Sequence, residues 1–306
     1  MSFWAPWAAL YGYSFDPGVV VPVLLSGWLY WRGRRISSWA AKPADRRARL
    51  WRGVAFYAGL GVILFALETP IDYLSNSLFW VHMVEHCLLQ VVAALLIVVG
   101  APWIPMWRGL PLRWRRAVAP GALAFAQRPL VTALRQFFRR PATCLGALAL
   151  TFWIWHIPYF FDAALGNIFV HETEHVTLLA SGLLYWSQTV DTAPLKRQLG
   201  TWSLAGYLVA GTAAMWVVAV SLGLSGHAWY APYYHLASRP GGISALTDQQ
   251  WGAGVAWVPA ALPFEIMLDV VVLQWLADDE RRADAAVAEY RAQRASGVDA
   301  PQPRES

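Results

Sequence analysis

The sequence has few charged residues and very little cysteine. Only 14% of its 306 residues are Asp, Glu, Lys or Arg, whereas an ordinary soluble domain has about 25%. The two cysteines, Cys87 and Cys144, lie in different apolar segments, so we expect no disulfide framework. The sequence also lacks the motifs G-x-x-x-x-G-K-[ST], G-x-S-x-G and C-x-x-C, and no basic region precedes its first apolar run. We therefore expect neither a phosphate-binding loop nor a cleaved signal peptide.

Hydrophobic residues make up 57% of the chain, and 19 of its residues are tryptophan. This composition predicts an all-α fold, a polytopic membrane bundle of seven transmembrane helices. The predicted spans are about 17–31, 53–67, 78–99, 142–157, 169–190, 202–224 and 254–276. Residues 1–277 would form the membrane domain, and residues 278–306 a charged cytoplasmic tail that is helix-like at first.

The basic residues predict the orientation of these spans. Of the 24 Lys and Arg residues, all except Arg239 lie in the connectors after spans one, three and five or in the tail. By the positive-inside rule the N-terminus lies outside and the C-terminus in the cytoplasm. This distribution explains the net charge of +5 without a nucleic-acid partner. Residues 1–16 resemble an aromatic cluster at a membrane interface. Residues 103–141 could form amphipathic helices that lie in the headgroup plane, or a solvated loop.

Histidines gather at the outward ends of the predicted spans. His82 and His86 begin the third span and His171 and His175 begin the fifth, and a spacing of four residues places both imidazoles of a pair on one helix face. His156 ends the fourth span on the same side of the membrane. Neutral imidazole is the commonest metal ligand and suits copper, zinc, iron and nickel. The five residues therefore predict a metal or haem site near the outer surface.

Four acidic residues lie at the same level: Glu68, Glu85, Glu172 and Glu174. They could accept hydrogen bonds from metal-binding imidazoles and fix their tautomers, or simply complement helix dipoles; both interpretations stay open. The stretch H-E-T-E-H at 171–175 also matches the zincin pattern H-E-x-x-H, although that interpretation needs a third ligand and a protease fold.

Other polar or sulfur-containing side chains lie within the predicted spans. Met83 and Cys87 each point about 100° away from the His82/His86 face, so we expect both to pack in the core. Glu265 and Asp269 are one turn apart inside the seventh span. An acid at that depth normally faces a partner or water, which leaves open a proton or cation path or a buried hydrogen-bonded pair.

Four stretches together resemble one family: V-H-M-V-E-H-C-L-L-Q-V-V-A-A-L-L-I-V-V-G-A-P (81–102), W-H-I-P-Y-F-F-D-A-A-L (155–165), V-H-E-T-E-H-V-T-L-L-A-S-G-L-L-Y-W (170–186) and T-D-Q-Q-W-G-A-G-V-A-W-V-P (247–259). They are similar to the polytopic caa3-type cytochrome c oxidase assembly factors, often called CtaG. The family's histidine positions match His82, His86, His156, His171 and His175. Val91-Val92-Ala93 stands where many members carry a Pro-rich helix break, which leaves the bend of the third span in question.

The resemblance implies a multi-pass protein of the bacterial plasma membrane that helps to assemble a haem-copper oxidase by handling copper. Its expected partners are oxidase subunits and membrane lipid, and a homodimer stays open. Such a protein would not be an enzyme. Two rival hypotheses remain: a membrane redox protein that holds haem or di-iron with the same histidine pairs, and a structural scaffold whose histidines are merely interfacial.

Overall fold

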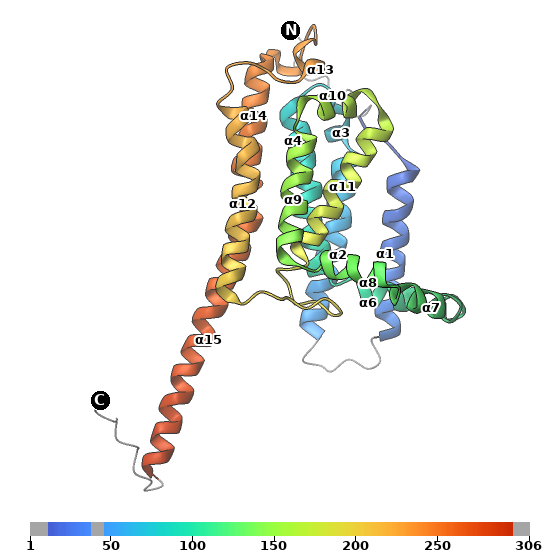
Figure 1. Cartoon of the computed structure of the whole chain (residues 1–306). Coiled ribbons are helices and arrows are strands. Elements are labelled where there is room, and N and C mark those ends of the chain that lie inside the picture. Colours follow the sequence, from blue (N-terminus) through green and yellow to red (C-terminus); the bar gives the residue numbers. More distant parts are fainter. Residues whose placement is uncertain (1–11, 38–45, 296–306) are drawn as a thin grey trace.

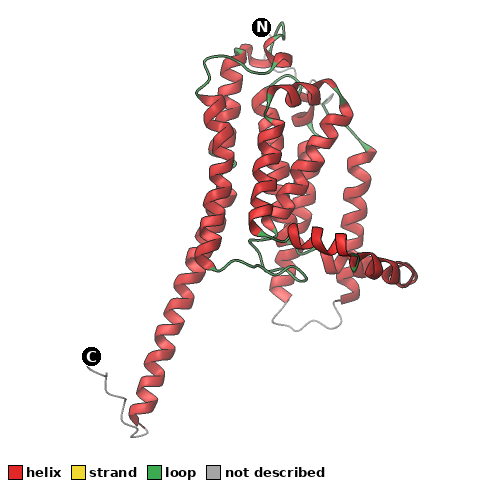
Figure 2. Cartoon of the chain, in the orientation of Figure 1, coloured by secondary structure: helices red, strands yellow, loops and turns green. Residues whose placement is uncertain are grey.

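The computed structural model describes residues 12–37 and 46–295, and in this part of the chain the regular structure is helical. Figure 2 shows the helices joined by loops, and a single bridge pairs Thr192 with Leu195. The predicted all-α fold is confirmed. Residues 1–11 of the expected aromatic cluster, Lys42 and residues 296–306 of the tail lie outside the described residues.

The helices are α1 (Pro17–Ser37), α2 (Arg46–Leu67), α3 (Pro70–Ser75), α4 (Phe79–Cys87), the π-helix η4 (Leu88–Ala93), α5 (Ala94–Val99), α6 (Trp103–Gly109), α7 (Leu112–Ala126), α8 (Pro129–Phe137), α9 (Pro141–Trp155), α10 (Pro158–Gly166), α11 (Ile168–Trp186), α12 (Thr201–Gly223), α13 (Ala231–Tyr234), the 3-10 helix η5 (Pro240–Gly242), α14 (Ala245–Trp257) and α15 (Leu262–Ala295).

Four helical stretches of the described chain are long and apolar enough to cross a membrane. They are Arg46–Leu67, Phe79–Val99, Thr201–Gly223 and Ala245–Arg294. The bent pair α9 and α10, with 71° between its halves, could be a fifth. The helices α1 and α11, expected as the first and fifth spans, are not among them, and α11 carries two histidines and two glutamates near its start. The structure supports a helical membrane protein, and the number seven stays a prediction.

The helices form an elongated bundle whose connectors are sorted between its two ends (Figure 1). In this view α3, α10 and α13 lie at one end, and α6, α7 and α8 lie toward the other. The helices α12, α14 and the first part of α15 form one side of the bundle, and α1 lies on the opposite side. Consequently, the starts of α4 and α11, which carry the histidine pairs, lie near the same end of the molecule.

The third predicted span is one continuous helical column that contains a π segment. The residues Val91-Val92-Ala93, where the sequence left a bend in question, lie in the π segment η4 between α4 and α5, and such segments often occur near functional sites. Here α11 packs very closely against the π segment. A Cβ added to Gly182 of α11 would lie 2.0 Å from the carbonyl oxygen of Gln90. The Gln90 amide also donates to the Leu148 carbonyl (3.2 Å) and to the Ser181 hydroxyl (3.0 Å). These contacts fix the α4 column against both α9 and α11.

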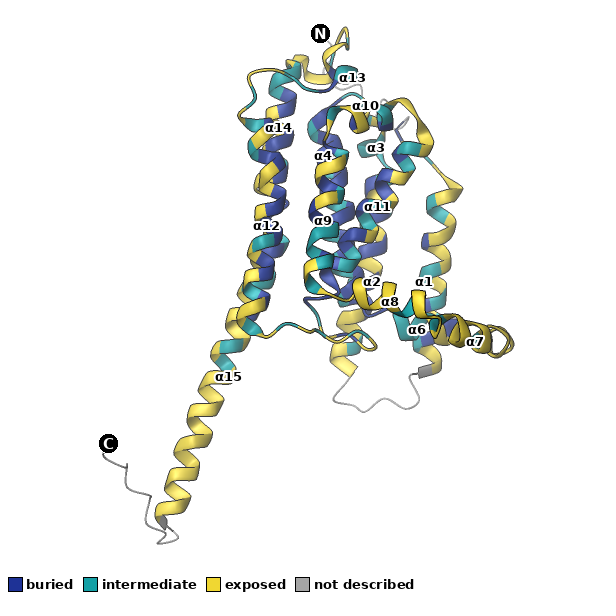
Figure 3. Ribbon diagram, viewed as in Figure 1, coloured by how far each residue is buried: buried dark blue, intermediate teal, exposed yellow. Residues whose placement is uncertain are grey.

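The seventh predicted span differs most from the structure. The sequence placed it at 254–276, but α14 begins at Ala245, a break follows Trp257, and α15 runs on to Ala295. Polar residues before 254 can lie in this helix because backbone groups from a distant segment satisfy their side chains. The Asp248 carboxylate accepts hydrogen bonds from the backbone amides of Phe79 (2.9 Å) and Trp80 (3.0 Å). The described part of the tail continues α15 rather than forming a separate helix, and it is largely exposed (Figure 3).

Residues 103–141 are mostly helical, as the amphipathic interpretation expects. Neither α7 nor α8 buries a residue, and Figure 3 shows both helices largely exposed. Their position in the headgroup plane stays a prediction.

Candidate metal centre

The helices α4 and α11 carry the same pattern, H-x-x-E-H, at 82–86 and 171–175. Positions i, i+3 and i+4 share one face of an α-helix, so each helix presents two imidazoles and one carboxylate together. Asn167 begins α11 by accepting hydrogen bonds from the amides of Phe169 (2.9 Å) and Val170 (3.4 Å). No side chain within α4 caps its start, and Asp248 from α14 accepts from the first amides there instead. Together with His156, these side chains form what we call the His/Glu cluster: His82, Glu85, His86, His156, His171, Glu174 and His175, each at most 8% exposed.

Each of the two helices sends its glutamate to the histidines of the other. The Glu174 oxygens lie 3.4 Å from Nε2 of His86 and 3.7 Å from Nε2 of His82. In return, Oε1 of Glu85 lies 3.2 Å from Nε2 of His175. The ring centroids of His82 and His171 are 5.5 Å apart. The two motifs therefore form one compact group rather than two separate pairs.

The cluster offers several sets of metal ligands. Three groups each have their ligand atoms within 4.8 Å of one another: His82, His86 and Glu174; His82, Glu85 and His171; and His171, Glu174 and His175. The Nε2 atoms of His82 and His86 are 2.7 Å apart. Two nitrogens on a tetrahedral ion with bonds of about 2.0–2.1 Å would be roughly 3.3 Å apart. The pair would therefore have to open by about half an ångström to hold one ion.

Many polar atoms of the cluster are buried without hydrogen bonds. They include both carboxylate oxygens of Glu85 and of Glu174, both ring nitrogens of His175, Nδ1 of His86 and Nε2 of His171. A buried polar atom without a partner costs about 1–3 kcal/mol, and more if it is charged. A bound cation would satisfy carboxylate oxygens and imidazole lone pairs together, so the residues present fit a metal ion.

Hydrogen bonds fix the tautomers of two histidines. Tyr233 donates its hydroxyl proton to the Ser75 carbonyl (2.5 Å), so its oxygen can only accept from Nδ1 of His82, 3.2 Å away. His156 donates from Nδ1 to the Phe152 carbonyl (2.7 Å). In both rings the proton is on Nδ1, which leaves the Nε2 lone pair free for an ion.

His156 lies where α9 ends, just before Pro158 begins α10, and its ring centroid is 5.5 Å from that of His86. Its Nε2 lies 2.9 Å from the sulfur of Met83. The sequence analysis expected Met83 in the core. Its side chain is fully buried, but its sulfur also faces the cluster. Sequence reasoning placed Met83 only in the core and missed Tyr233, because their partners come from distant segments.

The remaining sequence candidates lie apart from these ligand groups. Glu68 accepts hydrogen bonds from the Ser14 hydroxyl (3.2 Å) and the Asp16 amide (3.1 Å). Glu172 is half-buried and belongs to none of the three groups, although it is the zincin-like glutamate. The repeated H-x-x-E-H pattern is the signal that could have separated Glu174 from Glu172.

Several other side chains have environments that bear on the sequence analysis. The last two histidines, His227 and His235, are exposed. Cys87 is buried in the core as expected. Glu265 and Asp269 are exposed on α15. In α3, between the second and third predicted spans, burial raises the pKa of Asp72 to about 6.

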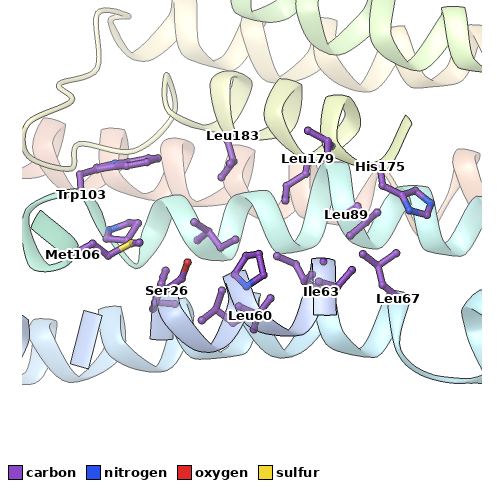
Figure 4. Close-up of a pocket in the computed structure, with 18 residues that line it drawn as sticks. Ser26, Leu60, Ile63, Leu67, Leu89, Trp103, Met106, His175, Leu179 and Leu183 are labelled. Carbon is purple, nitrogen blue, oxygen red and sulfur yellow. The ribbon is translucent and has the colours of Figure 1, made fainter. Parts of the chain in front are cut away.

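An apolar cavity of about 390 Å³ adjoins the cluster between α1, α2, α5, α6 and α11. Figure 4 shows His175 and Leu67 toward one end of it and Trp103 and Met106 toward the other. Among the described residues, none that lines it is an Asp, Glu, Lys or Arg. His175 thus belongs both to the His/Glu cluster and to the wall of the cavity.

Comparison with known proteins identifies the family. The family model described as cytochrome c oxidase caa3 assembly factor (Caa3_CtaG) matches residues 27–278. Two uncharacterized proteins, Mb0105 of Mycobacterium bovis and MT0111 of Mycobacterium tuberculosis, are each 25% identical over 241 residues, which are 78% of this chain and 36% of theirs. A third, ML1998 of Mycobacterium leprae, is 24% identical over 232 residues, 76% of this chain and 35% of its own. The chain thus spans only about a third of the length of these relatives. No solved structure matches. Because the family model covers most of the chain, including the whole His/Glu cluster, the protein belongs to the cytochrome c oxidase caa3 assembly factor family.

Proposed function

We propose that this protein binds copper in the His/Glu cluster and delivers it to a subunit of a haem-copper cytochrome c oxidase during assembly. The observation that carries the proposal is the reciprocal arrangement of the two H-x-x-E-H motifs, in which Glu174 lies against His82 and His86 and Glu85 lies against His175. Imidazole suits copper among other metals, and the family supplies the oxidase as the partner. Copper would be cargo, and no substrate bond would be made or broken.

The proposal includes the sidedness that the basic residues predict. Seven helices would cross the bacterial plasma membrane, with the N-terminus outside and the C-terminus in the cytoplasm. The His/Glu cluster would then lie toward the outer surface. Fluorescent-protein and alkaline-phosphatase fusions after residue 295 and within the 225–244 loop test this: the fluorescent fusion should be active only at the first site and the phosphatase only at the second. The reverse pattern would refute the orientation.

Copper binding is tested on the purified full chain. We expect the wild type to retain copper after loading and desalting, and His82→Ala and His171→Ala to lose most of it. His227→Ala is the matched control, because His227 is exposed and lies outside the cluster. Complementation of a strain that lacks the protein should show the same order in the copper content of its oxidase. Equal copper in all four proteins would refute the assignment.

A second candidate is a membrane di-iron protein. The specific observation in its favour is the pairing of two buried carboxylates with histidines, a ligand set known from di-iron helix bundles. Haem is less suitable, because its macrocycle would have to stand between axial imidazoles, whereas the rings of His82 and His86 contact edge to face with centroids 4.3 Å apart. Metal analysis together with a visible spectrum separates copper, di-iron and haem: iron without a Soret band would favour the di-iron protein over copper delivery.

A further inference from the structure

We propose that Met83 and His156 form a soft ligand pair for cuprous copper, Cu(I), within the His/Glu cluster. The inference rests on the proposed copper function and adds to it a sulfur ligand and an oxidation state. Its motivation is the 2.9 Å distance between the Met83 sulfur and Nε2 of His156.

The hydrogen bonding of His156 leaves no proton for that contact. A backbone carbonyl can only accept, so the bond to Phe152 places the ring proton of neutral His156 on Nδ1. Nε2 then has a lone pair, and a thioether sulfur has only lone pairs to offer. Two lone pairs face each other across 2.9 Å, an arrangement that a cation bound to both would stabilise. With metal–nitrogen and metal–sulfur bonds of about 2.0 Å and 2.3 Å, a trigonal ion would hold the two atoms roughly 3.7 Å apart, so the pair would have to open by about 0.8 Å.

The chemistry of the pair selects the ion. Thioether sulfur is a soft ligand that favours Cu(I), whereas carboxylates suit harder ions. Met83 is completely buried and His156 is 3% exposed, and both ligands are neutral, which suits a monovalent ion. His86 is the nearest candidate for a third ligand, since its ring lies 5.5 Å from that of His156 and its Nδ1 makes no hydrogen bond. The carboxylates contact the Nε2 atoms of the two H-x-x-E-H motifs instead.

Met83 also packs in the hydrophobic core, so the test must separate packing from ligation. Met215 of α12 is the matched control: it is 1% exposed and belongs to the same core cluster. Replacing either residue by Leu keeps the apolar volume nearly constant. Only the Met83 substitution removes a sulfur that faces a histidine nitrogen.

The experiment measures Cu(I) and Zn(II) affinity of the purified full chain under anaerobic conditions, by competition with chromophoric chelators. We expect Met83→Leu to weaken Cu(I) binding by about tenfold or more and to leave Zn(II) binding within about twofold, with Met215→Leu unchanged for both ions. X-ray absorption at the copper edge should show sulfur scattering in the wild type that disappears in Met83→Leu.

Two results would overturn the inference and leave copper binding intact: Cu(I) affinity unchanged in Met83→Leu, or a wild-type spectrum with nitrogen and oxygen ligands alone. An equal loss for Zn(II) and Cu(I) would show a packing defect and also overturn it. A wild type that binds no copper would instead refute the proposed function itself.

Discussion

Glu174→Gln is the most informative single substitution in the His/Glu cluster. Glu174 is fully buried, and its two oxygens lie 3.4 Å and 3.7 Å from the Nε2 atoms of His86 and His82. Gln keeps the size of the side chain and removes its negative charge. At an effective dielectric constant of about 20, one charge about 4 Å from a monovalent ion contributes about 4 kcal/mol, which is an upper limit because the amide oxygen can still coordinate.

We expect the substitution to weaken copper binding about 10–100-fold, the range seen when a partner of a metal-binding histidine is removed. This loss corresponds to about 1.4–2.8 kcal/mol. A competition titration of the purified protein with a chromophoric chelator measures it.

Glu172→Gln is the matched control, since Glu172 lies two residues away on α11, is half-buried and belongs to no ligand group. Its copper affinity should stay within about twofold of the wild type. The reasoning fails if Glu174→Gln binds copper as tightly as the wild type, or if Glu172→Gln weakens binding equally.

Three further substitutions test how the cluster is positioned. Gly182→Ala should sharply reduce the folded yield from membranes, because its Cβ would lie 2.0 Å from a carbonyl oxygen of η4, whereas Gly146→Ala, with open space around the added Cβ, should not. Asp248→Ala should lower the melting temperature, since it removes the cap of α4 at a cost of about 1 kcal/mol; an unchanged melting temperature would argue against that cap. Asp72→Asn should remove a pH dependence: because burial raises the pKa of Asp72 to about 6, the folded state favours the neutral acid, and wild-type stability falls as pH rises from about 4 to 6. The melting temperature at pH 4.5 relative to that at pH 7 should therefore be higher in the wild type than in Asp72→Asn, and an equal difference in the two proteins would contradict this.

The gathering of the histidine pairs at one end of the bundle could be predicted from sequence because its information is local. A spacing of four residues on a helix fixes which side chains share a face, and the basic connectors indicated which helix ends belong together. Which of the four glutamates contact the histidines depends instead on how separate helices pack. Glu174 and Glu172 are both near the start of α11; the repeated H-x-x-E-H pattern singles out Glu174, but the position of α4 decides that it meets the histidines of the other helix.

The predicted seventh span shows why helix limits were harder to predict than helices. Hydropathy places a span where apolar residues are dense, and residues such as Asp248 and Gln249 look like part of a loop. In the structure they lie within α14 because distant backbone groups satisfy them: Asp248 accepts from the start of α4, and Gln249 donates to the carbonyls of Leu222 and His227. Similarly, Met83 was assigned to the core because its distance from His156 depends on how α9 packs.

The cavity beside His175 gives the cluster one side that is not close-packed. Elsewhere a buried ring cannot turn without displacing its neighbours, because protein interiors pack about as densely as organic crystals. His175 borders about 390 Å³ of apolar space, so its ring has room to turn on that side. Under the proposed copper function, an ion held by His175 would lose this ligand when the ring turns into the cavity, and the α1–α2 side would be the direction of release.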